Sequence, residues 1–208
     1  MSAARSDARR RRTQGGYTLI EVMTAIGILM VGGVGIFAIE EGAIIANAEA
    51  RRMATAQHVA ATVIERIRRD ALNWTLGGPS MPSTALDRTT YLVNAGGVPG
   101  VGATAWMRTP MAGTESFGFD YWGNDTTVAA SMAFCAQMRF EWVYPNQAIR
   151  ADVRVYYPRR GDAQADDGMN AAAWVNCPGT TLDSAALLAD LRFAQLSTVV
   201  RWTTGPMP

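Results

Sequence analysis

The chain has 208 residues and a formal net charge of +1, and all 19 of its basic residues are arginine. The absence of lysine excludes P-loop and Schiff-base chemistry, and the single histidine, His58, excludes zinc sites built from several histidines. Residues 1–16 hold five arginines and one acid, which leaves 14 arginines and 17 acids, a net charge of −3, in the remainder. Because nucleic-acid-binding domains carry basic surfaces, this balance argues against nucleic acid as the main partner.

Residues 17–39 form an apolar run in which Glu21 is the only charged residue. A helix of about 20 apolar residues spans the hydrocarbon core of a bilayer, so the run is long enough to cross a membrane. The arginines before it favour a cytoplasmic N-terminus. We therefore expect a single-pass protein whose C-terminal part is exported.

Glu21 is unusual because a carboxylate inside a membrane segment is costly and needs a partner or a function. A secretory signal peptide is cut after its apolar part, whereas here Gly15 and Gly16 precede the apolar part. Cleavage after Gly16 keeps the apolar helix and makes Tyr17 the first residue, with Glu21 as the fifth. A free amine and a carboxylate at this spacing suit pairing with a neighbouring copy in the membrane plane.

The sequence GGYTLIE at residues 15–21 resembles the class III signal of type IV pilins and pseudopilins. The resemblance implies cleavage after Gly16 by prepilin peptidase, methylation of the Tyr17 amine, and a role for Glu21 in docking into a filament. Tyr17 stands where phenylalanine is commoner. The alternative is an ordinary signal anchor with a chance glutamate.

The apolar pattern predicts one helix over residues 17–74, because no proline occurs before Pro79 and Gly77 and Gly78 form a stop signal. Residues 1–16 are expected to be a cleaved leader. The helix then has a membrane half at 17–41 and an amphipathic half at 42–76. In the second half, apolar residues recur at spacings of three and four, which is the pattern of an amphipathic helix. This set consists of Ile45, Met53, Ala56, Ala60, Val63, Ile67 and Ala71. Glu65 and Arg69 are predicted to form an i,i+4 ion pair.

Residues 77–208 are expected to form a globular domain with variable loops. Alternating side chains predict strands at 134–144, 149–157 and 196–203, with a hairpin turn at 145–147. Shorter strands at 90–94 and 104–109 and a short helix at 183–192 are also predicted. The fold class is therefore α+β, a long helix packed on an antiparallel sheet. This order of elements resembles the type IV pilin fold.

Cys135 and Cys177 both fall in the exported part, where disulfides are permitted. With two cysteines only one intramolecular pair exists, and closing a loop of about 40 residues stabilises by roughly 3–4 kcal/mol on the chain-entropy model. We expect this disulfide; the alternative is two free buried thiols.

Other polar residues give weaker signals. Acids at positions 162, 166 and 167 with Asn170 suit either a solvated loop, which we favour, or a calcium site, although the spacing departs from the usual calcium-loop pattern. Glu115, Asp120 and Asp125 lie near Tyr121 and Trp122, and we expect them to be surface residues rather than a catalytic carboxylate pair. No catalytic set, metal site or cofactor motif emerges, so we expect no enzyme.

Within the pilin class, Arg51, Ala54, Ala60 and the sequence ERIR at 65–68 resemble PilV-type minor pilins. This resemblance implies a minor pilin that primes assembly or forms part of the tip of a type IV pilus. The alternatives are a minor pseudopilin of a type II secretion system, a surface adhesin whose loops at 77–128 bind a ligand, and a membrane-anchored enzyme. The implied partners are other pilins, prepilin peptidase, the inner-membrane assembly platform and membrane lipid.

Overall fold

The computed structural model describes residues 16–75, 84–96, 102–128, 131–158 and 191–202. These residues divide into two compact units, one ending at Ile45 and the other beginning at Ala46. The helix α1, Leu19–Thr75, contributes to both units. The predicted long helix is confirmed, and its end falls within a residue of the predicted one.

The second half of α1 packs on the sheet through one face. Its buried side chains recur at spacings of three and four, as the amphipathic pattern predicts. They are Ala56, Val59, Ala60, Val63, Ile64, Ile67, Ala71 and Trp74. Ile45 and Met53 are 45% and 47% exposed, so the prediction that they belong to this buried face is wrong. The buried face begins at Ala56.

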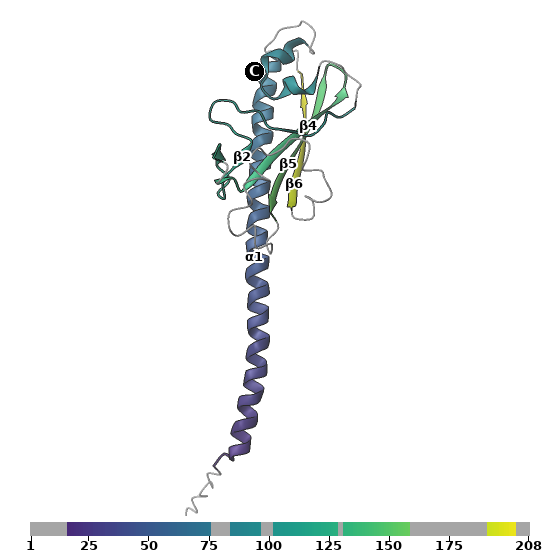
Figure 1. Cartoon of the computed structure of the whole chain (residues 1–208). Helices are drawn as coiled ribbons and strands as arrows, with labels where there is room; N and C mark the ends of the chain where they lie inside the picture. Colours follow the sequence, from purple (N-terminus) through teal and green to yellow (C-terminus); the bar gives the residue numbers. More distant parts are fainter. Residues whose placement is uncertain (1–15, 76–83, 97–101, 129–130, 159–190, 203–208) are drawn as a thin grey trace, which may run out of the picture. The chain divides into compact units, whose positions relative to one another are not determined.

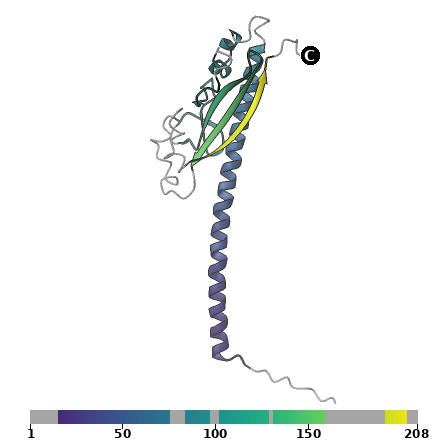
Figure 2. The same ribbon diagram turned by 90° about the vertical axis from the view of Figure 1, so that its right-hand side faces the viewer.

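Three long antiparallel strands form the sheet that α1 covers (Figures 1 and 2). They are β4 (Phe134–Tyr144), β5 (Ala148–Pro158) and β6 (Leu191–Arg201). Three short strands complete it: β1 (Met107–Arg108), β2 (Gly118–Phe119) and β3 (Asp125–Thr126). The strand order is β3-β2-β4-β5-β6, with β1 also paired to β4. The α+β layout and the predicted long strands are confirmed.

The hairpin turn between β4 and β5 is where the sequence predicts it. Asn146 adopts a positive φ of 60°, a conformation that asparagine tolerates better than most residues.

The far face of the sheet is not simply solvated, because Phe117, Met132, Cys135 and Tyr156 form a second buried cluster there.

Three predicted elements differ. The strand predicted at 104–109 is limited to Met107–Arg108. Residues 90–94 do not form a strand: the chain makes two 3₁₀ helices, η1 (Thr84–Arg88) and η2 (Leu92–Ala95). The Asp70 carboxylate on α1 is the reason, since it accepts the backbone N–H groups of Thr90, Tyr91 and Leu92 at 2.9, 2.7 and 3.0 Å. The predicted helix at 183–192 is wrong at its end, where residues 191 and 192 begin β6; residues 183–190 lie outside the described residues.

Polar residues also order the far face of the sheet. Asp152 on β5 is 2% exposed, accepts hydrogen bonds from Arg139 and Arg150 at 2.9 Å each, and accepts another from Ser197 at 2.6 Å. Burial disfavours its charged form, but these three donors outweigh burial and hold the pKa of Asp152 below its usual value. Three adjacent strands are therefore joined by one ionised carboxylate.

Replacing Asp70 should destabilise the domain far more than replacing an exposed acid nearby. Asp70→Ala leaves three backbone donors without their acceptor, and we expect a loss of about 2–4 kcal/mol in the free energy of unfolding. Asp87→Ala, at an exposed position in η1, should change it by less than about 0.5 kcal/mol. Chemical unfolding of the full chain in detergent, followed by near-UV circular dichroism, measures both. Equal effects of the two substitutions would show that the Asp70 contacts contribute nothing.

Candidate functional site

The N-terminal site consists of the residues around the first turn of α1. Gly16, Tyr17 and Thr18 precede the helix, and the backbone N–H groups of Glu21 and Val22 donate to the Thr18 carbonyl at 3.1 and 3.3 Å. Glu21 thus stands in the first turn, where the helix dipole favours a negative charge. These hydrogen bonds fix the backbone position from which the Glu21 side chain extends.

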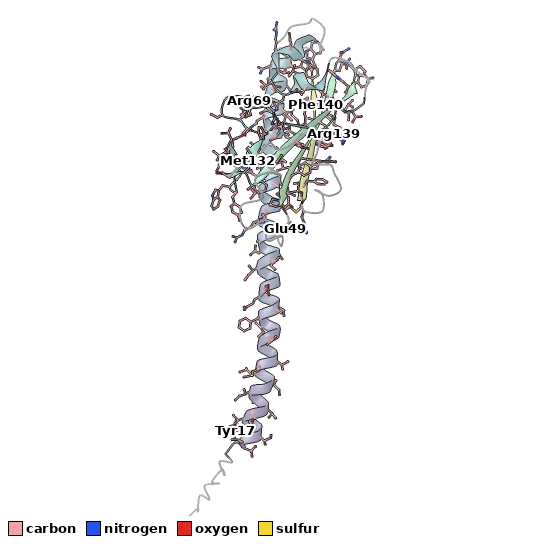
Figure 3. All side chains as sticks on the ribbon, viewed as in Figure 1. Tyr17, Glu49, Arg69, Met132, Arg139 and Phe140 are labelled. Carbon is pink, nitrogen blue, oxygen red and sulfur yellow. The ribbon has the colours of Figure 1, made fainter. Side chains whose placement is uncertain are left out.

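Tyr17 and Glu21 lie on the same side of the helix. Both line a shallow groove that continues along Val22, Ala25, Ile26 and Leu29. Tyr17 is 83% exposed at the start of α1 (Figure 3). The structure therefore brings together the two side chains that the sequence singles out, on an apolar and open surface.

The helix surface beyond this site is apolar and uncovered. Its large apolar side chains from Leu19 to Ile45 are between 45% and 80% exposed. By length and composition the helix could cross a membrane. Such a surface is unstable in water and requires lipid or protein around it.

Two further acids, Glu40 and Glu41, end the apolar run, and both are exposed. Within the described residues, neither side chain has a hydrogen-bond or ion-pair partner. Positions three and four residues away on the helix carry only apolar or small side chains, so no intrahelical pair is available to them.

A polar cluster in the second unit joins the loops to α1. Arg66, only 8% exposed, binds Asp125 through two hydrogen bonds and lies 3.7 Å from Glu115. The Tyr91 hydroxyl donates to Glu115 at 2.5 Å, and burial, together with this carboxylate, raises the pKa of Tyr91. Glu115 and Asp125, predicted to be surface residues, have side chains 23% and 25% exposed and also hold a buried guanidinium.

The predicted ion pair of Glu65 has a different partner. Arg68, at i,i+3, binds Glu65 at 2.5 Å, whereas Arg69 approaches Glu115 at 3.7 Å. Arg68 also donates to Thr198 on β6 at 3.2 and 3.3 Å, which fixes its direction. A contact 130 residues away thus decides between two spacings that the local sequence leaves equal.

The remaining predicted sites lie partly beyond the described part of the chain. Cys135 is buried in β4, while Cys177 lies outside the described residues, so the disulfide stays a prediction. The acidic segment at 162–170 also lies outside them. In the part that the structure describes, no three histidine, cysteine or acidic side chains form a metal-binding group, and His58 is exposed.

Comparison with known proteins gives one match. The family model of the prokaryotic N-terminal methylation motif matches residues 11–37, the region that contains Gly16, Tyr17 and Glu21. No curated protein and no solved structure matches the chain. The chain therefore carries the N-terminal signal of the type IV pilins and pseudopilins, followed by an α+β domain with a pilin-like layout.

Proposed function

We propose that the chain is a minor pilin of a type IV pilus, which enters the filament through the first half of α1. The observation that supports this proposal most directly is the apolar helix of residues 19–45, which is exposed along its length and has Tyr17 and Glu21 together at its start. A helix of this kind can be covered first by lipid and later by the helices of other subunits.

In this proposal prepilin peptidase cuts after Gly16 and the new amine on Tyr17 is methylated. The amine then lies four residues from Glu21. A carboxylate in an apolar environment is costly unless a cation matches it, and the Tyr17 amine of a neighbouring subunit, or of the same chain, supplies that cation. The pair guides each incoming subunit to its place.

The resemblance of the ERIR stretch to PilV-type pilins supports the minor role, with the chain priming assembly or forming part of the tip. The coarser assignment, a type IV pilin or pseudopilin, rests on the methylation motif. A minor pseudopilin of a type II secretion system is the second candidate, because the two classes share this motif. The neighbouring genes distinguish the two assignments.

Processing is the first test. Intact-mass measurement of the protein from native membranes should show the loss of residues 1–16 and the gain of one methyl group. A substitution at the cleavage site, Gly16→Val, should leave the full-length mass, because the bulky side chain blocks the peptidase. A wild-type N-terminus at any other residue would remove the basis for the pilin assignment.

Glu21→Ala should leave membrane insertion intact and lower incorporation into pili by at least about tenfold, because an amine left without its carboxylate in an apolar site is costly. Glu21→Gln keeps the shape without the charge and should behave in the same way. Immunoblots of sheared pili against whole cells measure incorporation.

The matched control is Glu65→Ala, which removes an exposed charge from the same helix outside the apolar part. It should enter pili like the wild type. If Glu21→Ala does so too, Glu21 is not the docking group.

The predicted disulfide has its own test. Non-reducing peptide mapping of exported protein should recover Cys135 and Cys177 in one linked pair, and reduction should lower the free energy of unfolding by roughly 3–4 kcal/mol. Cys135 is fully buried in β4, so reduction should require partial unfolding. Recovery of both cysteines as free thiols would contradict the pairing.

A further inference from the structure

An exposed aromatic pair stands on a turn in the second unit. Trp122 is 78% exposed and Tyr121 is 51% exposed, with their rings 5.5 Å apart and nearly perpendicular. Large aromatic side chains dominate the hot spots of protein interfaces because they bury much area at a small entropic cost. Their exposure here indicates a binding surface.

The turn that carries this pair is held in place. The Asp120 carboxylate accepts the backbone N–H groups of Trp122 and Asn124 at 2.9 and 2.8 Å. Gly123 has a φ of +84°, and a Cβ atom there would lie 3.3 Å from Cγ2 of Thr55 on α1. The backbone therefore lies close against the helix, and the aromatic side chains are pre-organised for binding.

Next to the aromatic pair is a pocket of about 530 Å³. Its lining residues are Arg51, Arg52, Ala54, Thr55, Tyr121, Trp122 and Phe134. Within the described residues, the exposed Arg51 guanidinium has no partner, and that of Arg52 reaches only the Pro158 carbonyl, at 3.5 Å. The pocket thus offers an apolar wall and two cations, a combination that fits an acidic and aliphatic segment.

Residues 40–45 have this composition. Glu40 and Glu41 are exposed and have no partner in the described part of the chain, and Ile44 and Ile45 are 63% and 45% exposed. The glutamates stand ten to twelve residues before the arginines, and only residues three or four apart pair on one helix. Among the residues that the structure describes, two adjacent acids and two adjacent cations on α1 therefore have no ion-pair partner.

We propose that the pocket beside Trp122, lined by Arg51 and Arg52, binds residues 40–45 of a second copy of this chain. The two glutamates face the two arginines, and the isoleucines pack against Trp122 and Tyr121. This inference rests on the proposed function, because it is a contact between pilin subunits. It joins two different surfaces, so it is a head-to-tail contact and not a self-complementary one.

A double-mutant cycle tests the contact between full-length copies with two different tags, co-expressed and purified from native membranes. In each variant both tagged copies carry the same substitutions. The variants R51Q/R52Q and E40Q/E41Q should each lower co-purification of the second copy by about five- to tenfold. The variant with all four substitutions should lose no more than either double variant, because each pair already removes the same contact. The glutamates are replaced by glutamine and their charges are not reversed, because arginines at these positions beside the apolar run would disturb membrane topology.

Two outcomes of the cycle overturn the proposal: no loss in either double variant, or a loss in the quadruple variant equal to the product of the two separate losses. Intact-mass measurement of every variant reports processing. If the protein is cleaved after Gly16 but the double variants co-purify the second copy as well as the wild type does, this contact alone is refuted. If the wild type is not cleaved after Gly16, the pilin assignment is refuted.

Photo-crosslinking identifies the occupant directly. A benzophenone amino acid in place of Trp122 should capture a peptide containing residues 40–45 of the second copy. The same group in place of Tyr144, a 63% exposed aromatic residue at the end of β4, is the control and should not capture it. Capture of lipid or of another polypeptide at position 122 in place of this peptide overturns the proposal.

Discussion

The apolar surface of residues 19–45 is the constraint on which the rest of the molecule depends. Fifteen large apolar side chains there are exposed, and covering each one stabilises by about 1.5–3 kcal/mol. The total is on the order of 20–45 kcal/mol, which greatly exceeds the few kcal/mol associated with one membrane carboxylate. Apolar burial therefore strongly favours lipid or protein around this part of the helix. In the proposed pilin, the Glu21–amine pair sets the register of the helix, because a charge pair has a direction that apolar contact lacks.

In the second unit, buried polar side chains of α1 specify the conformation of the loops that pack on it. Apolar contacts hold the sheet against the helix, but they do not specify a loop conformation. Asp70 binds three consecutive backbone N–H groups of the segment at 90–92, and Arg66 binds Asp125 at the start of β3. Both are buried, so losing either partner leaves a desolvated polar group. The helix thus serves as the rigid element to which the loops are attached.

The sequence predicts the parts of the fold that depend on local periodicity. The long helix, the strands β4 and β5, and their turn follow from spacings within the segments themselves. The conformation of residues 90–92 escapes prediction because Asp70, which binds their backbone, lies about twenty residues earlier. The burial of Arg66 depends on Asp125, 59 residues away, and nothing in either local sequence signals it. The Asp120 and Gly123 spacing is the one local signal that could have found the aromatic turn.

Among the described residues, every ion pair has a guanidinium as its cation, since the chain contains no lysine and His58 forms no ion pair. A guanidinium stays protonated throughout the pH range in which proteins remain folded. Alkaline solution therefore leaves these ion pairs intact, whereas acid breaks them from the carboxylate side. The same composition leaves amine-directed reagents without a side-chain target in this sequence. In a chain cleaved after Gly16, acylation would then report on the terminal nitrogen alone.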